Sequence, residues 1–462
     1  MHSPRGIAVI DAGANNTKIA VLSHHGVPLA ERKIASRHVE GPPYRHIDPE
    51  PLVDFCRHAL PDLDRLVPLD VIVPCAHGAA LACLAADGSL VLPVMDYTAE
   101  PPARIVAEYR KMEPSFSEVY CTLLPMALTH ALQLFWQERA FAQDFTRIET
   151  IITWIQYVGF RLCGRAVSEI SSLSCQSQLI DVPNNRFSSL ARGRGWNRLF
   201  APMTEAWQTI GRLLPEFRGD GFRGEGRVLA GVHDSNANYL RYLAAGLNRF
   251  TLLSSGTWII GFDNSTPLSS LAKERDTASN TDVFGRHVAS CRFYGGREFQ
   301  ILAKGALAGA ASLEAVSRLI DRGTFALPSF TDSGGPVPNS GGKGRIIGPP
   351  PASPEENSTL AALYCALMVS ESLDAIGSKH DVVIDGPFSE NDIFLRLLAA
   401  LRSQQRLFTS DLRDGTTAGA ACLALMPDGK LPQIELALRA VEPARVAGLF
   451  VYRENWRRLL SG

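Results

Sequence analysis

The fold is decided by residues 6–22, which have the sequence GIAVIDAGANNTKIAVL. The apolar run Gly6–Ile10 is typical of a strand that is buried on both faces. Asp11–Asn16 is a cluster of turn-forming residues, and Thr17–Leu22 resumes the pattern of a strand. A third strand is predicted over Val27–Ile34. The chain is therefore expected to begin with three strands joined by short turns.

The same pattern returns near the middle of the chain. Arg249–Ser254 predicts a strand, Ser255, Gly256 and Thr257 form a tight polar turn, and Trp258–Phe262 predicts a second strand. The two halves thus begin alike, although the repeat is too degenerate to be seen as sequence identity. With the mixed α/β segments between them, the sequence predicts an α/β protein of two lobes.

Other segments give a coarser reading of secondary structure. Helical spacing of apolar residues predicts helices over Pro49–Leu60, Pro125–Phe141, Ile148–Phe160 and Glu355–Ile376, and strands are predicted over Asp70–Val73 and Val382–Ile384. Two segments are rich in Gly and Pro. They predict a loop with one helix over Pro183–Gly226 and a long loop over Pro328–Pro354.

The composition is that of a globular protein. The 462 residues are 46% hydrophobic and 20% charged, and at ~150 residues per domain this length predicts two or three domains or one large fold. Lys and Arg number 46 against 47 for Asp and Glu, so the net charge is −1. No global field attracts the chain to nucleic acid or to an anionic membrane, and neither partner is expected.

The cysteines and the apolar runs indicate the compartment. Nine cysteines are scattered along the chain without a CxxC pair, which is typical of buried apolar residues in a reducing cytoplasm. The N-terminus lacks the apolar segment of a signal peptide. The longest apolar run, Leu360–Val369, is about half of the ~20 residues needed to span a bilayer. We therefore expect a cytoplasmic protein.

The first turn carries residues suited to phosphate. Gly13 lets backbone N–H groups approach an anion, and Asn15 and Asn16 add side-chain donors. Asp11 ends a strand, where its carboxylate oxygens suit Mg²⁺, and Lys18 supplies a cation nearby. A plain β-hairpin with Asp, Asn and Gly in its turn explains the same residues.

The second turn, with Ser255, Gly256 and Thr257, offers donors suited to the same ligand. Two such turns in corresponding places of two lobes suggest a nucleotide whose phosphates are held from both sides. Asp234 follows the predicted strand Arg227–Ala230, where a carboxylate is able to accept a proton from a hydroxyl nucleophile. A helix N-cap is the alternative for Asp234.

Two glycine-containing loops lie near the C-terminus. Gly386 and Pro387 follow a predicted strand and precede a helix, as nucleotide-contact loops do in open α/β sheets. Gly415 and Gly419 precede or begin another helix, where small residues allow a backbone or a ring to approach closely. Helix-start and tight-packing glycines remain the alternative for both pairs. The sequence contains no GxxxxGK[ST].

Taken in order, these motifs resemble the FGGY family of carbohydrate kinases in the actin-like ATPase superfamily. Residues 11–18 are similar to the first phosphate motif of the family, with Ala14 in place of the usual Thr, as in rhamnulose kinases. Residues 253–258 resemble the second phosphate motif, again in its rhamnulose kinase form. Residues 231–235 resemble the segment that carries the catalytic aspartate of the family, and residues 162–169 resemble an L-x-G stretch of its first domain. Residues 75–78 and 92–97 resemble a stretch that lines the sugar site. It extends over nearly the whole chain.

The adenine loop departs from the family pattern. That loop is usually a run of glycines followed by Ser, whereas residues 385–389 are Asp-Gly-Pro-Phe-Ser here.

The resemblance implies two actin-like (ribonuclease H-like) lobes with sugar and MgATP in the cleft between them. A sugar-binding lobe is expected over residues 1–248 and a nucleotide-binding lobe over residues 249–462. Asp234 would accept the proton of a sugar hydroxyl as its oxygen attacks the γ-phosphoryl group, and Asp11 would help to place Mg²⁺. The family also implies that a homodimer or a larger oligomer forms.

The residues expected to contact ligands follow from the same resemblance. Those assigned to the nucleotide are Asp11, Gly13, Asn15, Asn16, Lys18, Ser255, Gly256, Thr257, Gly386, Pro387, Gly415 and Gly419. Those assigned to the sugar are His77, Gly78, Asp96, Tyr97, Glu169, His233 and Asp234. A strand-end polar residue or a core aromatic is the alternative explanation for His77, Asp96, Tyr97 and Glu169.

The rhamnulose-kinase-like motifs favour a deoxyketohexose such as L-rhamnulose or L-fuculose as substrate. A ketopentose such as xylulose or ribulose, or a polyol such as glycerol, is the alternative within the family. An actin-like ATP-binding regulator without sugar chemistry is the alternative from another class of protein.

Overall fold

The computed structural model describes residues 5–332, 335–410 and 414–461. The chain forms two compact units. Unit 1 contains Met1–Leu247, Asn280–His287 and Asp414–Glu435, and unit 2 contains Asn248–Ser279, Val288–Arg413 and Leu436–Gly462. The mixed α/β architecture agrees with the predicted fold class.

Unit 1 is built on a seven-stranded sheet in the order β14-β15-β6-β1-β2-β3, with β16 also paired to β6. The three strands predicted at the N-terminus are confirmed as β1 (Gly6–Ala12), β2 (Asn16–Ser23) and β3 (Pro28–Ala35). The other strands are β6 (Leu69–Ala76), β14 (Thr209–Arg212), β15 (Arg227–Leu229) and β16 (Val232–His233). β1 pairs antiparallel with β2 and parallel with β6.

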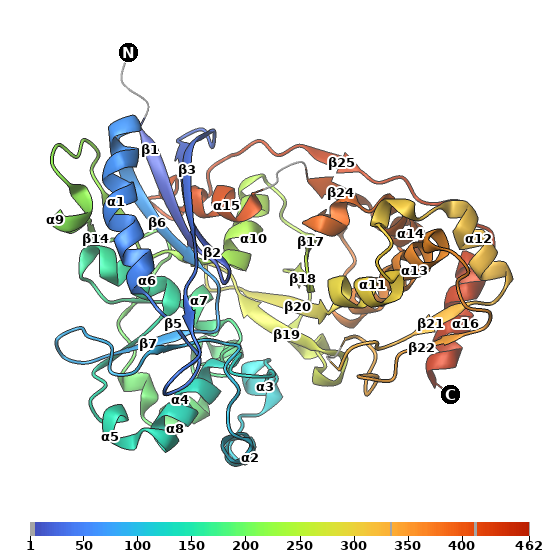
Figure 1. The fold of residues 1–462 in the computed structure, drawn as a ribbon, viewed down its shortest axis with the longest axis horizontal. Helices are drawn as coiled ribbons and strands as arrows, with labels where there is room; N and C mark the ends of the chain where they lie inside the picture. Colours follow the sequence, from blue (N-terminus) through green and yellow to red (C-terminus); the bar gives the residue numbers. More distant parts are fainter. Residues whose placement is uncertain (1–4, 333–334, 411–413, 462) are drawn as a thin grey trace. The chain divides into compact units, whose positions relative to one another are not determined.

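Helices cover both faces of this sheet (Figure 1). Ala8, Ile10 and Val21 point to one face, where they share a core with α1 (Glu50–Leu66) and α6 (Trp154–Cys163). Their neighbours in the strands point to the other face and share a core with α10 (Asp234–Ala244) and α15 (Gly415–Ala424). The continuous apolar run of β1 is explained, because alternate side chains enter two different cores.

Unit 2 repeats this pairing. Its sheet has the order β19-β20-β18-β17-β23-β24-β25. β17 pairs antiparallel with β18 and parallel with β23, as β1 does with β2 and β6, so the internal repeat predicted from the sequence is confirmed. The strands are β17 (Phe250–Ser255), β18 (Ile259–Asp263), β19 (Thr277–Thr281), β20 (His287–Phe293), β23 (Asp381–Asp385), β24 (Leu407–Ser410) and β25 (Leu438–Ala440).

The long helix α13 (Pro354–Ala375) packs against α11 (Gly295–Ala303) and α14 (Asp392–Leu401) in unit 2 (Figure 1). The remaining elements are β4 (His38–Val39), β5 (His46–Ile47), β7 (Leu81–Leu84), β8 (Val94–Met95), α2 (Ala103–Arg110), α3 (Phe116–Val119), α4 (His130–Ala140), α5 (Ala142–Phe145), β9 (Thr150–Thr153), β10 (Ser168–Glu169), α7 (Ile170–Ser174), β11 (Ile180–Asp181), β12 (Arg186–Phe187), α8 (Ser189–Gly193), β13 (Met203–Thr204), α9 (Pro215–Arg218), α12 (Leu313–Asp321), β21 (Phe325–Leu327), β22 (Arg345–Ile347) and α16 (Leu449–Ser461). Among the described helices, none is long and apolar enough to cross a membrane.

Three expectations need correction. The segment Ile148–Phe160 is not one helix, because strand β9 precedes α6 within it. The region Pro183–Gly226 holds α8, α9 and several short strands rather than one helix, and Pro328–Pro354 contains β22, which pairs with β21.

The first change of unit falls between Leu247 and Asn248, one residue before the expected boundary. The chain then returns to unit 1 at Asn280–His287 and Asp414–Glu435. A single boundary position does not describe these two returns. The division into a sugar-binding lobe and a nucleotide-binding lobe stays a prediction.

Candidate active site

Three of the predicted site residues of unit 1 lie where three parallel strands end. β1, β6 and β16 run in the same direction, and Asp11 is in register with Cys75, while His233 is in register with Ala76. Asp11 therefore lies at the same edge of the sheet as His77, which follows β6, and Asp234, which follows β16. The carboxyl ends of parallel strands are the usual place for a ligand in α/β sheets.

The first phosphate turn is held by the segment that follows β3. The Ser36 hydroxyl donates to the carbonyl oxygen of Gly13 at 2.7 Å, and the Ser36 N–H donates to that of Asn15 at 3.0 Å. His38 Nε2 lies 2.6 Å from the carbonyl oxygen of Ala14. Three consecutive carbonyl oxygens thus have partners, which fixes the turn. Asn15 and Asn16 are exposed at its tip.

Lys18 lies in β2 directly opposite Asp11. Its ammonium group forms an ion pair with Asp414, a partner that the sequence did not indicate. Asp414 also caps α15 by accepting from the Thr417 N–H at 3.2 Å. The Asp-Gly pair at the start of a predicted helix was the only local signal for Asp414.

Asp11 is surrounded by other carboxylates. Burial and the negative charge of Asp234 raise the pKa of Asp11 to about 7, Lys18 opposes them, and Asp414 raises the pKa further. No group of three His, Cys, Asp or Glu side chains among the described residues is arranged to hold a metal ion. Mg²⁺ commonly takes one or two carboxylates and completes its shell with substrate phosphates and water. The negative charges of Asp234 and Asp414 near Asp11 fit such a site, because a divalent cation would neutralise them. Asp11 is the residue that would hold the ion.

Asp234 is the first residue of α10, after His233 at the N-cap position. Its Oδ1 accepts from the Ser235 N–H at 2.6 Å, in the first turn of the helix. The structure places His233 at the N-cap, so Asp234 lies one residue inside the position that the N-cap alternative gave it. The side chain is 34% exposed, so it is accessible to a substrate hydroxyl.

His233 lies behind Asp234. Its Nε2 is 3.3 Å from Asp234 Oδ1 and 3.7 Å from Cys175 Sγ, and the side chain is almost fully buried. Burial alone would lower the pKa of His233, but Cys175, Asp234 and Glu169 raise it to about 9. A Cβ atom at Gly78 would lie 2.7 Å from Nε2, so Gly78 leaves the space that the imidazole occupies.

His77 and Tyr97 come together beside this pair. Their ring centroids are 5.4 Å apart in an edge-on arrangement, and His77 Nδ1 lies 2.8 Å from the carbonyl oxygen of Gly78. Burial lowers the pKa of His77, which favours the neutral imidazole. A neutral imidazole has one donor and one acceptor nitrogen, a combination suited to a hydroxyl group.

Asp96 is buried and its carboxylate is fully engaged. Oδ1 accepts from the N–H and the hydroxyl of Thr98, each at 2.8 Å, and Oδ2 is 3.2 Å from Arg45 Nε. His38 Nδ1 lies 2.6 Å from Oδ2, without the alignment of a hydrogen bond. Burial acts to raise the pKa of Asp96, but Thr98, His38 and Arg45 outweigh it and lower the pKa.

His38 therefore joins the turn predicted to bind phosphate to the predicted site residue Asp96, which is far from that turn in the sequence. One nitrogen contacts the first phosphate turn at Ala14, and the other contacts Asp96. The sequence offered no signal for His38, because its two partners come from other strands.

Glu169 is completely buried at the N-cap of α7. Its carboxylate accepts four hydrogen bonds of 2.7–2.8 Å from the N–H groups and hydroxyls of Ser171 and Ser172. Burial raises the pKa of Glu169 in spite of these bonds. These contacts make Glu169 a residue that organises the chain just before Cys175, and its contact with sugar stays a prediction.

Gly415 and Gly419 lie against helix α10. A Cβ atom at Gly415 would be 2.1 Å from Asn238 Oδ1, and one at Gly419 would be 1.7 Å from the carbonyl oxygen of Ala237. Glycine at these two positions therefore allows α15 to pack on α10. Their contact with a nucleotide stays a prediction.

The second phosphate turn lies in unit 2, between β17 and β18. The Ser255 hydroxyl donates to the carbonyl oxygen of Asp385 and accepts from the Phe388 N–H at 3.0 Å. Gly386 has φ +81°, and a Cβ there would be 2.0 Å from the carbonyl oxygen of Ser255. The predicted phosphate turn and the predicted adenine loop are thus locked together within this unit. Thr257 is exposed and Gly256 partly exposed.

Comparison with known proteins gives the class. Residues 247–433 match the family described as carbohydrate kinase FGGY, C-terminal domain. A carbohydrate kinase from Novosphingobium aromaticivorans is 32% identical, with 99% of each chain covered and a TM-score of 0.91. Xylulose kinase from Lactobacillus acidophilus (14% identity, 99% of this chain and 96% of that chain, TM-score 0.80) and Plasmodium falciparum glycerol kinase (12%, 99% and 98%, 0.79) share the fold. No curated protein sequence matches the chain.

These likenesses define an ATP-dependent carbohydrate kinase. The chain belongs to the FGGY family of carbohydrate kinases. This membership replaces the alternative of an actin-like regulator without sugar chemistry.

Proposed function

We propose that this enzyme phosphorylates a hydroxyl group of a ketose, and that Asp234 is its general base. The observation that carries the assignment of Asp234 is its place at the carboxyl end of β16, in a unit where it raises the pKa of Asp11. Its partly exposed carboxylate supports the same role. The catalytic assignment rests on this position and on the motif of residues 231–235.

In the proposed reaction Asp234 accepts the proton of the sugar hydroxyl as the hydroxyl oxygen bonds to the γ-phosphorus. The bond between that phosphorus and the bridging oxygen breaks, and ADP leaves. Phosphoryl transfer depends mainly on positioning and on neutralising charge. Mg²⁺, when bound, neutralises phosphate oxygens, and Asp11 is the residue proposed to hold it.

The phosphates are assigned to two turns. In unit 1 these are the N–H groups of Gly13, Asn15 and Asn16, because the carbonyl oxygens of this turn already have partners. Lys18 supplies a cation, which also forms an ion pair with Asp414. In unit 2 the exposed part of the turn, Gly256 and Thr257, is assigned to the same nucleotide, while Ser255, Gly386 and Pro387 fix the surrounding loop.

The sugar is assigned to His77, Tyr97 and His233 around Asp234. His77 and Tyr97 present an edge-on pair of rings, which combines an apolar surface with polar atoms. A positioning role is assigned to Asp96, Glu169 and Gly78. The two carboxylates already accept hydrogen bonds within the protein, and the imidazole of His233 occupies the space beside Gly78.

We propose a deoxyketohexose such as L-rhamnulose or L-fuculose as the substrate, on the rhamnulose-kinase-like form of both phosphate motifs. A ketopentose or a polyol is the second candidate. A cytoplasmic location is proposed because all nine cysteines are free and eight of them are buried. A homodimer is proposed from the family resemblance alone.

The experiment is ADP release with MgATP across L-rhamnulose, L-fuculose, D-xylulose, L-ribulose and glycerol. A kcat/KM at least about tenfold higher for one deoxyketohexose supports the proposed substrate. The highest kcat/KM on a ketopentose or on glycerol would instead select the second candidate.

A further inference from the structure

A cavity of about 380 Å³ lies in unit 2 where the loop after α13, the turn after α14 and the beginning of α16 meet. Small-molecule sites commonly have volumes of ~300–1,000 Å³. Ser378 and Gln405 line the cavity just before β23 and β24 begin, whereas Gly386 follows the other end of β23. The cavity is therefore distinct from the turns proposed to bind phosphate in this unit.

The cavity is lined by cations without carboxylates. Lys379, Arg402 and Arg453 contribute to its wall, and none of its lining residues is Asp or Glu. Lys379 is exposed and has no ion-pair or hydrogen-bond partner among the described residues. Arg453 is 22% exposed, and its Nε lies 3.2 Å from Glu454, which does not line the cavity. Its Nη1 donates to the Leu401 carbonyl oxygen at 3.4 Å. The wall therefore favours an anion.

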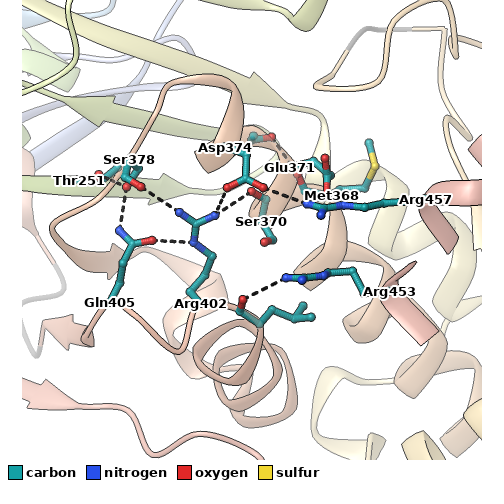
Figure 2. Close-up of polar contacts among 12 residues, drawn as sticks. Thr251, Met368, Ser370, Glu371, Asp374, Ser378, Arg402, Gln405, Arg453 and Arg457 are labelled. Carbon is teal, nitrogen blue, oxygen red and sulfur yellow. Dashed lines mark hydrogen bonds and ion pairs between the residues drawn. The ribbon is translucent and has the colours of Figure 1, made fainter. Parts of the chain in front are cut away.

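Arg402, which lines the cavity, is held by several polar contacts (Figure 2). Its Nε donates to Gln405 Oε1 at 2.6 Å, and a terminal nitrogen donates to the Ser378 carbonyl oxygen at 2.9 Å. Asp374 neutralises the guanidinium. Gln405 Nε2 in turn lies 3.0 Å from the Ser378 hydroxyl, which is 2.6 Å from that of Thr251 in β17.

This network separates two roles. Arg402 shapes the wall because its charge and most of its donors are already used. Lys379 and the Nη2 group of Arg453, which have no hydrogen-bond partner among the described residues, are left to meet a ligand. They lie on a surface that is organised before the ligand arrives. A preorganised wall lowers the ordering cost of binding.

The other lining residues indicate the rest of the ligand. Ser403 and Gln404 are exposed polar residues on the turn, and Phe450 is 50% exposed beside Arg453, whose guanidinium lies 5.5 Å from its ring. We propose that the cavity binds a phosphomonoester of a small polyhydroxylated molecule. The phosphate is placed between Lys379 and Arg453, the hydroxyl groups face Ser403 and Gln404, and the carbon skeleton contacts Phe450. A phosphomonoester carries about −1.5 to −2 at pH 7, which matches two cations.

The test is isothermal titration calorimetry of the full-length protein at pH 7.5 and low salt, with D-fructose 1-phosphate and inorganic phosphate as probes. The test variant combines Lys379→Gln and Arg453→Gln. The matched control combines Lys273→Gln and Arg458→Gln. These are an exposed lysine of the same unit and an exposed arginine five residues after Arg453 in α16, and neither lines the cavity. Thermal unfolding checks that both variants fold.

We expect D-fructose 1-phosphate to bind more tightly than inorganic phosphate. The test variant is expected to lose at least about tenfold in affinity, the loss of roughly one charge-assisted hydrogen bond, and the control less than twofold. Equal affinity for both probes would contradict the organic ester. Absence of binding up to 10 mM, or equal losses in both variants as expected for binding elsewhere, would overturn the site.

Discussion

The ammonium group of Lys18 in β2 is paired with the carboxylate of Asp414, the N-cap of α15, 396 positions later in the chain. The pair joins the first hairpin of unit 1 to a helix formed by a late return of the chain. It also places a negative charge near the cation proposed to contact phosphate. We therefore expect Asp414 to determine how much of the Lys18 charge is available to a nucleotide.

Asp414→Asn is expected to lower the KM for MgATP by about two- to tenfold. Asparagine caps a helix about as well as aspartate, so the variant removes the charge and leaves Lys18 free for phosphate. The control is Asp414→Ala, which should also destabilise the protein by ~1 kcal/mol through loss of the cap. A higher KM in Asp414→Asn at unchanged Tm would show instead that Asp414 itself helps to bind the metal–nucleotide.

Asp11 is expected to make stability depend on pH. Its pKa is about 7 in the folded protein and ~4 in the unfolded chain. Between these values the folded state binds more protons, so the contribution of Asp11 to stability falls as pH rises through this window. Asp11→Asn should therefore be more stable than wild type at pH 8 by on the order of 2–4 kcal/mol, and the advantage should shrink toward pH 4.

Chemical denaturation at several pH values without MgATP measures this difference. Asp220→Asn, at an exposed position of the same unit, is the control and should show no such trend. An advantage of Asp11→Asn that is the same at pH 4.5 and pH 8 would contradict the raised pKa.

Gly419→Ala is expected to destabilise the protein by at least ~2 kcal/mol. The new methyl group would lie 1.7 Å from the Ala237 carbonyl oxygen, and overpacking of this kind typically costs ~1–3 kcal/mol. Gly193→Ala is the matched control, because a Cβ there meets open space at the end of α8. Thermal unfolding distinguishes the two. If Gly419→Ala kept its Tm and raised only the KM for ATP, nucleotide contact rather than packing would explain the glycine.

His38→Ala is expected to raise the KM for both substrates by several-fold. The side chain contacts Ala14 in the first phosphate turn and Asp96 near the proposed sugar site, so its loss loosens both. Steady-state kinetics with each substrate varied in turn measures the two KM values. His58→Ala, an exposed histidine of α1, should change neither. An effect confined to kcat would contradict a positioning role.

The parts of the fold that local sequence determines were predictable. The apolar runs of β1 and β17, each followed by a Gly-containing turn, gave both hairpins at their observed places. The prediction of one helix over Ile148–Phe160 was wrong because the apolar residues of this segment are nearly continuous. A buried strand and a buried helix cannot be distinguished by periodicity there, and the β-branched Thr150–Thr153 stretch was the signal for β9.

The contacts between distant segments could not be predicted. Lys18 and Asp414 meet only because α15 packs on α10, and His38 reaches Asp96 only because β4 and β8 both pair with β5. Neither pairing has a local pattern. Gly419 could not be interpreted from local sequence for the same reason. A glycine at this place in the sequence suits contact with a ligand and contact with another helix equally well, and only the position of α10 distinguishes them.

The central claim is that Asp234 is the general base. Asp234→Asn should lower kcat by at least ~10²-fold, the low end for loss of a general base, because asparagine keeps the shape of the side chain but cannot accept the proton. Its Kd for MgATP should stay within about twofold of wild type. The most direct test measures both quantities on the same preparation, with the best sugar of the panel. Turnover near the wild-type rate with intact MgATP binding would contradict the proposed role of Asp234.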